Sequence, residues 1–458
     1  MWLPIQVCLR SLSVVLIVSA VVLQMVAVEW GWAQDAVAEE PELRLSLREA
    51  IAAAMDNNNS VRLLKERIAA AQAQANQSFG AMMPNLSGYV NQRNQTVNLA
   101  AFGIPQNRIA QLGIPGARTD PFDIFDARGS LVQNIFSLSL IQRWRAAKTG
   151  ITVADLEAEI TKRDTTATVG LLYVEALRAE AAVKAKQANV QLGQELLKLA
   201  RDRKSAGVAT GLDVTREEVQ LENERQQLLI AENDVETAKL NLTRSLGIDF
   251  GVRLVLTDEL KLVEARPQVP DEALRIAKEH RLELKAQETR QKLASLSLSS
   301  VTSERVPSLS VNGDYGWIGT KPDEAIGTHT VGVTLSVPIF DGGQREGRIS
   351  ENRSRVRQES IRMKDVSDQV TLEVRNALLT LNSTLQQVAV AQKGLDLAQK
   401  ELTFARDRFA AGLTTNIEVT NAQAALARAR DNLVEALFRF NASRINLARA
   451  QGQLDALL

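Results

Sequence analysis

One long stretch of this sequence occurs twice. Residues Ala200–Gly247 align without a gap with Ala405–Gly452, and each residue matches the one 205 positions later, as Gly207 matches Gly412 (412 − 207 = 205). A copy of about 200 residues is longer than the repeats of common solenoids, so each half should be a whole structural unit. Two such units in one chain favour a pseudo-symmetric wall of repeated elements over a single catalytic cleft.

The composition favours long helices over a compact mixed core. Only 4% of the 458 residues are aromatic and 11 are proline, while Ala, Leu, Gln, Glu and Arg are abundant. Lys and Arg together number 54, as do Asp and Glu, and no run of five or six like charges occurs. The charge balance therefore gives no indication of nucleic-acid binding.

Cysteine and histidine are too sparse for redox or metal chemistry. Cys8 is the one cysteine, and its removal with a leader would leave a mature chain without thiols. His280 and His329 stand far apart with no cysteine to support a metal site. We expect no catalytic residue, no metal ligand and no cofactor.

The N-terminus reads as an export signal. Ser11–Val28 is apolar and follows Arg10, and Gly31 and Ala33 fit a small-x-small cleavage pattern. We assign residues 1–33 to a signal peptide that is cut after Ala33. The alternative is an uncleaved membrane anchor, since about 18 apolar residues nearly span a bilayer. In either case the rest of the chain is exported.

The chain divides into two repeats, at residues 34–250 and 271–458, joined by a linker at residues 251–270. Each repeat is expected to run helix, strand, strand, long helix, tight glycine turn, helix. The first repeat opens with a helix over Leu45–Phe79, which Gly80 and Pro84 end. The two strand pairs should then emerge at one end of the helices, with both glycine turns at the other.

Apolar and polar residues alternate where strands are expected. The alternation is clean over Ser308–Trp317 and Thr330–Val337, and weaker over Leu86–Asn91 and Phe125–Leu131. Period two places one face of each strand in apolar surroundings and the other in polar ones. The segment from about Gln95 to Pro121 should be a loop, because glycine and proline recur in it too often for a helix.

A helix of about 100 Å is expected over residues 344–411, which contain no proline. Apolar residues occupy a strict heptad there, namely Val374, Leu381, Val388, Leu395, Leu402 and Phe409, beside a row of Ala and Thr. A strict heptad imposes a left-handed supercoil on the helix and its partners. A plain helical core explains such a stripe in a short helix, but this length favours a coiled coil or helical barrel.

Four strands in one chain are too few to close a barrel, and open edges would be exposed. Several copies around an axis would close it. Three copies would give twelve strands, within the range of outer-membrane barrels, with the apolar face toward lipid and the polar face toward a water-filled lumen.

The motifs of the chain resemble those of TolC-type outer-membrane efflux proteins. The resemblance lies in the strand-to-helix turn Val337–Gly343, the glycine turn Gly412–Val419 and the opening segment Leu45–Ile51, and it covers nearly the whole mature chain. It implies a mainly α fold with a β-barrel portion: a homotrimer with a helical barrel across the periplasm and a shared 12-stranded barrel in outer-membrane lipid. It also implies an outer-membrane channel that passively exports cargo delivered by an inner-membrane transporter and a periplasmic adaptor.

This chain departs from the family pattern at two places. Asn134–Ser139 stands where the second repeat has Pro338–Gly343, so the first strand-to-helix junction should turn differently. Little follows the last helix, so the belt around the middle of the helices should be small and drawn mainly from Gly251–Asp271.

The resemblance implies a periplasmic gate at the glycine turns. Glu418 takes the position of the first acid of a cation-selecting ring, and the second acid is Asn421 here. The gating tyrosine of the family falls at Phe409 and its gating arginine at Thr414, so the closed state should depend on packing around Phe409 more than on salt bridges. Asp213 is kept at the equivalent turn without a tyrosine partner.

A simpler role is also open for both acids: Asp213 and Glu418 would offset the helix dipole in the first turn of their helices. The turns around Gly207 and Gly412 are the expected adaptor contacts.

The same residues also bear on two other functional classes, an enzyme and an exported adaptor. No phosphate-binding loop, Cys/His cluster or acid–base constellation supports an enzyme. An exported coiled-coil adaptor or scaffold also carries heptads, but long alternating strands at the ends of the longest helices favour the duct. Drugs, metals, polysaccharide and unfolded protein all fit a polar lumen as cargo.

Overall fold

The computed structural model describes residues 42–111, 113, 116–263 and 269–454. The expected signal peptide at residues 1–33, its cleavage after Ala33, and Cys8 lie outside the described residues. Apart from the first residues of strands β1 (Glu42–Leu45) and β4 (Arg253–Leu256), all elements belong to one compact unit, Arg44–Phe250 with Leu254–Leu458.

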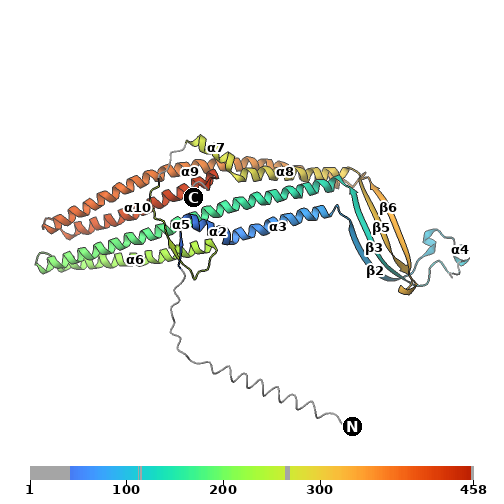
Figure 1. The fold of residues 1–458 in the computed structure, drawn as a ribbon, viewed down its shortest axis with the longest axis horizontal. Coiled ribbons are helices and arrows are strands. Elements are labelled where there is room, and N and C mark those ends of the chain that lie inside the picture. The colour runs from blue at the N-terminus through green and yellow to red at the C-terminus, as the bar shows by residue number, and fades with distance from the viewer. Residues whose placement is uncertain (1–41, 112, 114–115, 264–268, 455–458) are drawn as a thin grey trace, which may run out of the picture. The chain divides into compact units, whose positions relative to one another are not determined.

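Each repeat contains a strand pair, a long helix and a closing helix, but opens with two helices where one was predicted. The first comprises α2 (Leu47–Asn57), α3 (Asn59–Gly80), β2 (Asn85–Gln95), β3 (Phe122–Phe136), α5 (Leu138–Ser205) and α6 (Gly211–Leu246). The second comprises α7 (Pro270–His280), α8 (Leu282–Thr302), β5 (Ser308–Gly319), β6 (Ile326–Ser336), α9 (Gln344–Ala410) and α10 (Asn416–Gln451). Within the unit, both strand pairs lie at one end of the helices and both glycine turns at the other, as predicted (Figure 1).

The prediction of one opening helix over Leu45–Phe79 was wrong. Leu45 ends β1, and the helix is interrupted at Asn58, where ψ is 130°. The Asn58 side chain accepts a hydrogen bond from the Ser60 amide at 2.7 Å and donates Nδ2 to the Ser245 carbonyl at 2.6 Å. Asn58 thus caps the start of α3 and the end of α6 together. These caps interrupt the helix at Asn58, although the residues on both sides favour a helix.

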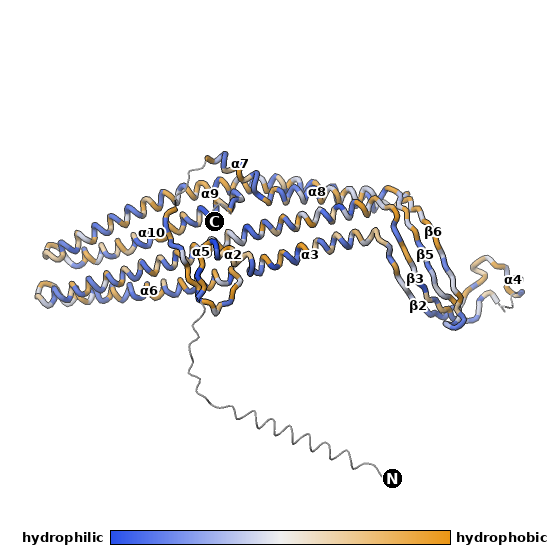
Figure 2. The backbone as a smooth tube through the Cα atoms, in the orientation of Figure 1, coloured by the Kyte–Doolittle hydropathy of each residue, from blue (hydrophilic) through white to orange (hydrophobic). Residues whose placement is uncertain are grey.

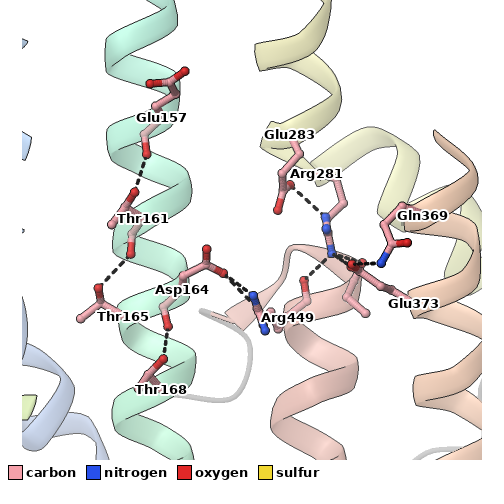
Figure 3. Close-up of polar contacts among 11 residues, drawn as sticks. Glu157, Thr161, Asp164, Thr165, Thr168, Arg281, Glu283, Gln369, Glu373 and Arg449 are labelled. Atoms are coloured by element: carbon pink, nitrogen blue, oxygen red, sulfur yellow. Dashed lines mark hydrogen bonds and ion pairs between the residues drawn. The ribbon is translucent and has the colours of Figure 1, made fainter. Parts of the chain in front are cut away.

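The same joint recurs in the second repeat at Arg281. This buried arginine donates to the Arg449 and Ala450 carbonyls at the end of α10, both at 3.4 Å. It also pairs with Glu283 at 2.9 Å and with Glu373 of α9 at 2.8 Å, while Arg449 pairs with Asp164 of α5 at 2.9 Å (Figure 3). These joints fix α3 end to end with α6, and α8 end to end with α10. The resulting stacks lie alongside the long helices α5 and α9.

The four long strands form one antiparallel sheet in the order β2-β3-β5-β6. Leu86, Leu131, Gly313 and Val331 lie in register across one face, and the three apolar side chains are exposed. On the other face, Arg128 pairs with Asp126 at 2.8 Å and Asp314 at 2.9 Å. The predicted alternation is confirmed, and β2 and β6 remain as the two edges.

The segment between β2 and β3 is not the plain loop that was predicted. It holds a short 3₁₀ helix, η1 (Leu99–Phe102), and a six-residue helix, α4 (Gln106–Gln111), in which Ile109 is fully buried. Gly103 and Pro105 lie between these two short helices instead of preventing them. The predicted difference between the two strand-to-helix junctions is confirmed, since only Ser137 separates β3 from α5 whereas Val337–Gly343 separates β6 from α9.

The heptad predicted for the long helix faces the core. Val374, Leu381, Val388, Leu402 and Phe409 are buried and Leu395 is partly buried, and apolar and polar positions alternate along α9 (Figure 2). α9 packs on α10 and α8, whereas α5 packs on α6, α3, α8 and α10. The contacts of α5 with α8 and α10, and the pairing of β3 with β5, join the two repeats.

The belt includes more than the predicted segment Gly251–Asp271, because β4 pairs with β1 from before the first helix. The buried Tyr173 of α5 fixes the belt, since its hydroxyl lies 2.8 Å from Asp258 Oδ2 and 3.0 Å from the Leu45 carbonyl oxygen. Burial and the neighbouring Asp258 raise the pKa of Tyr173. Among the described helices, none combines the length and apolarity needed to cross a membrane.

Candidate functional site

The two glycine turns share one backbone geometry. Gly207 and Gly412 both have φ of 75°, which glycine adopts without strain. The Val208 amide donates to the Arg203 carbonyl at 3.0 Å, and the Leu413 amide to the Arg408 carbonyl at 2.9 Å. These bonds close the ends of α5 and α9 in the same helix-terminating motif, and each turn leads directly into the next helix of its hairpin.

Asp213 caps the helix that it begins. Its carboxylate accepts the Thr210 amide at 2.9 Å and the Thr210 hydroxyl at 2.8 Å, which completes a capping box at the start of α6. The Thr210 hydrogen bonds lower the pKa of Asp213 below its ordinary value. Both findings support the simpler role of Asp213 at the helix start.

Replacing Asp213 with alanine should destabilise the first turn of α6 by about 1 kcal/mol at neutral pH, as loss of a cap does. Hydrogen exchange of the amides in the first turn of α6 should then be roughly fivefold faster. Because the folded pKa is lowered, the stabilising contribution is complete above the ordinary Asp pKa and is lost as the pH falls through the folded value. The difference from wild type should therefore shrink at acid pH.

Glu418 is the matched control, because α10 begins at the equivalent position without a side-chain capping bond. Glu418→Ala should change the exchange of its own first turn less than Asp213→Ala does. Equal effects of the two substitutions would contradict the role of the capping box.

Phe409 lies at the contact between the two hairpins, α5–α6 and α9–α10. Its ring is 5% exposed and packs in a cluster with Leu196 of α5 and Val419 of α10. Arg203 of the other hairpin stacks its guanidinium 4.4 Å from the ring centroid and donates to the Phe409 and Ala410 carbonyls at 2.6 and 2.9 Å. Arg203 thus caps α9 from the neighbouring hairpin and covers the ring in a cation–π contact.

The other gate candidates lie together within the second hairpin. Glu418 pairs with Arg408 at 3.5 Å and accepts the Thr414 hydroxyl. Asn421 is exposed and lines a groove at the start of α6 and α10 with Leu212, Val219 and Ile417. Phe409 and Glu418 therefore differ in position: the phenyl ring joins the two hairpins, whereas the carboxylate is held inside one of them.

A buried carboxylate that the sequence did not single out links the hairpins more deeply. Glu217 of α6 is 1% exposed, and its Oε1 accepts Asn416 Nδ2 at 2.9 Å and the Thr420 hydroxyl at 3.1 Å, both from α10. Its Oε2 has no partner among the described residues. Glu217 shares a helical face with Val214 and Leu221, so a charged residue in an apolar stripe was the available signal.

Further polar contacts join the hairpins along α5 and α10. Lys186 pairs with Asp431 at 2.8 Å, and Arg430 donates to Asn189. Burial lowers the pKa of Arg430, which Glu224 partly offsets. In the described part of the chain, no group of three or more His, Cys, Asp or Glu residues could hold a metal ion.

Comparison with known proteins identifies what this arrangement is similar to. The family model described as outer membrane efflux protein matches residues 50–248 and 273–453. The outer membrane protein TolC of Vibrio cholerae is 23% identical over 341 residues, covering 73% of this chain and 78% of that protein. The outer membrane efflux protein BepC of Brucella suis is 25% identical over 286 residues, covering 61% of each.

The fold matches solved structures over most of its length. A membrane protein from Pseudomonas aeruginosa superposes with a TM-score of 0.75 at 20% identity, covering 91% of this chain and 94% of that one. The two segments matched by the family model correspond to the two repeats, and both glycine turns fall inside them.

Proposed function

This chain belongs to the outer membrane efflux protein family, and we propose that three copies of it form one continuous duct. Family membership makes it an outer-membrane efflux channel that extends into the periplasm, and the family is not enzymatic. In the proposed trimer, four strands from each copy close a 12-stranded barrel in the outer membrane. The helices of the three copies close a second barrel below it.

The observation that best supports a trimer is that each repeat leaves one edge, of strand and helices, without a partner inside the chain. Within the chain, β3 and α5 of the first repeat pack on β5, α8 and α10 of the second. The corresponding elements β6 and α9 of the second repeat lie at one edge of the chain, and β2, α3 and α6 lie at the other. In the trimer, β6 and α9 of one copy would pack on β2, α3 and α6 of the next copy. This contact would repeat the one that β3 and α5 make with β5, α8 and α10 inside the chain.

The side chains on these edges fit this proposal. Leu372, Leu379 and Leu397 of α9 are exposed, whereas their equivalents 205 positions earlier, Ala167, Val174 and Leu192, are buried against the second repeat. On the other edge, Leu240 is half-exposed while its equivalent Ile445 is buried. A head-to-tail interface of this kind closes into a ring when the rotation per copy allows it.

The gate, selectivity and partners follow as parts of the same proposal. Glu418 would supply one carboxylate per copy to a ring at the axis, and Arg408 at 3.5 Å would weaken its field. Asn421 adds no charge to this ring, so we expect weak cation selectivity. Phe409 and Thr414 take the positions of the family's gating residues, with Phe409 keeping the hairpins together by packing.

An adaptor would contact the turns around Gly207 and Gly412, where Leu212, Val219 and Ile417 line an apolar groove. An inner-membrane transporter would deliver the cargo. The alternative of an exported coiled-coil adaptor is set aside on the family match.

Cross-linking and conductance of the same preparation test the trimeric duct. Ile445 Cδ1 lies 3.4 Å from a Cβ built on Gly170, and the equivalents of these two residues are Leu240 and Arg375. Leu240→Cys with Arg375→Cys, in a Cys8→Ser background, should form disulfides between copies and give a ladder that stops at three chains. The same preparation in planar bilayers should show small conductance steps with a weakly cation-selective reversal potential in a salt gradient.

The matched control pairs Leu240→Cys with Val390→Cys, which lies more than four helical turns from Arg375 along α9 and should not cross-link. A chain that stays monomeric and forms no channel would contradict the proposal. A ladder ending at two or four chains would refute the trimer while leaving the duct intact.

A further inference from the structure

A pocket of about 580 Å³ lies at the belt, a size typical of sites that bind small molecules. Its floor is formed by three buried residues of α5, namely Tyr173, Val174 and Leu177. The start of α2, residues 257–261 and 263 of the belt, and α10 form its walls. All of these elements belong to one chain, so the pocket does not depend on the proposed trimer.

Hydrogen bonds hold the belt over this floor at both ends of the pocket. At one end, Asp258 Oδ2 accepts the Tyr173 hydroxyl at 2.8 Å and the Leu47 amide at 2.9 Å. At the other end, Asn441 Nδ2 of α10 donates to the Lys261 carbonyl at 3.1 Å. The belt thus spans the space between α2 and α10, and the pocket is already formed without a ligand.

Arg444 of α10 lines this pocket as a half-buried cation without an opposite charge. Among the described residues, its one polar partner is the Asn441 amide oxygen, 3.5 Å from Nη1, which is long for a hydrogen bond. Burial lowers the pKa of Arg444, and no acid in the described part of the chain offsets this effect. The buried Arg281, by contrast, pairs with both Glu283 and Glu373. A bound anion would supply the charge that Arg444 lacks.

The first repeat shows how the chain neutralises a cation at the equivalent position. The equivalent of Arg444 is Lys239 (444 − 205 = 239), which pairs with Glu180 of α5 at 2.9 Å. The equivalent of Glu180 is Leu385 of α9 (180 + 205 = 385), whose side chain cannot accept a hydrogen bond. The second repeat therefore has the cation but has leucine where the first repeat has its acid.

The lining of the pocket favours a ligand with one negative charge and an apolar body. The charged residues of the lining are Arg48, Lys261, Arg444, Asp258 and Glu259. Three positive and two negative charges leave one positive charge, which a monoanion balances and a phosphate dianion exceeds. A guanidinium can donate to both oxygens of a carboxylate at once. Beside Arg444, the apolar side chains of Val174, Leu177 and Leu260 line the same space.

We propose that this pocket binds an amphipathic monocarboxylate. Its carboxylate accepts hydrogen bonds from the Arg444 guanidinium, and its apolar part packs on Val174, Leu177 and Leu260. The ligand then contacts α5 of the first repeat, α10 of the second and the belt between them. Because it binds the folded arrangement of these three elements, it stabilises the belt against the helices.

Isothermal titration calorimetry of the detergent-purified full chain tests this, with phenylbutyrate as the probe and a titration into detergent alone as the blank. We expect saturable binding and a rise in the temperature at which helical circular dichroism is lost. Arg444→Gln should weaken binding at least about tenfold, because hydrogen bonds to a charged group are lost. Lys239→Gln is the matched control, since its cation is already paired with Glu180, and it should bind as wild type does.

A second variant keeps the test independent of how well Arg444→Gln folds. Leu385→Glu leaves every residue of the pocket in place and supplies the acid of the first repeat, so it should compete with the ligand and weaken binding as well. Equal binding by wild type and both variants would overturn the proposal, as would a wild type that shows neither heat nor a thermal shift.

The chemical class of the ligand is tested with phenylbutanol, the neutral counterpart of the probe, and with inorganic phosphate. Tighter binding of either one than of phenylbutyrate would refute a monocarboxylate site. These results are independent of the trimer, which the Leu240–Arg375 cross-link tests separately.

Discussion

Replacing Phe409 with alanine should make the resting channel leak. The ring is almost fully buried between the hairpins, and truncating a buried phenylalanine costs about 3–5 kcal/mol. The Arg203 guanidinium, stacked 4.4 Å from the ring, would lose its cation–π partner as well. Because the loss falls on the contact that keeps the hairpins of one copy together, parted hairpins should become at least about a hundredfold more populated.

Single-channel recording of the purified protein measures this effect as resting conductance. Glu418→Ala is the matched comparison at the same tip, since Glu418 is partly exposed and its partners among the described residues, Arg408 and Thr414, belong to its own hairpin. An exposed ion pair contributes about 0–1 kcal/mol, so the closed level should hardly change, while the reversal potential should move toward zero. A closed state that is unchanged in Phe409→Ala would refute the dependence on packing.

Replacing Gly247 with alanine should strongly destabilise the first repeat. A Cβ at this position would lie 2.5 Å from the Asn57 carbonyl oxygen, and φ is 73°, which alanine adopts only with strain. To make room for the methyl group, the end of α6 and the α2–α3 break would have to move apart. That movement would break the hydrogen bond from Asn58 to Ser245. We expect a destabilisation of about 3 kcal/mol or more, seen as a lower temperature for the loss of helical circular dichroism.

Gly412→Ala separates backbone strain from overlap. Gly412 has nearly the same φ, 75°, but nothing lies within 4 Å of a Cβ placed there. This substitution should cost only about 1–2 kcal/mol and leave the assembly intact. If Gly412→Ala and Gly247→Ala lowered the transition equally, the close approach at the helix joint would not be what requires glycine.

The features that sequence predicted well are those with a local period. The heptad through Val374 and Phe409 fixed the buried face of α9, because every seventh residue of a helix returns to nearly the same side. The strand faces followed from alternation for the same reason. The glycine turns were predicted because a left-handed residue that ends one helix before another begins is usually glycine.

The features that sequence missed depend on partners distant in the chain. The break at Asn58 is set by the end of α6, some 190 residues later, and a helical pattern on either side hides it. The sequence does not distinguish Glu217, because its partners Asn416 and Thr420 lie in the other repeat. Family resemblance did not supply Glu217 either, since it drew attention to the aperture residues Glu418 and Asn421.

Joining the two repeats in one polypeptide also changes how the protein can evolve. A ring of six identical single repeats would carry every substitution six times, so no contact between neighbours could change alone. In a chain that contains both repeats, a substitution at position 217 recurs three times around the proposed ring and leaves position 422 as it was. In the proposed ring, two different repeats in one chain give a lower symmetry than six identical repeats, so the contacts at positions 217 and 422 can differ.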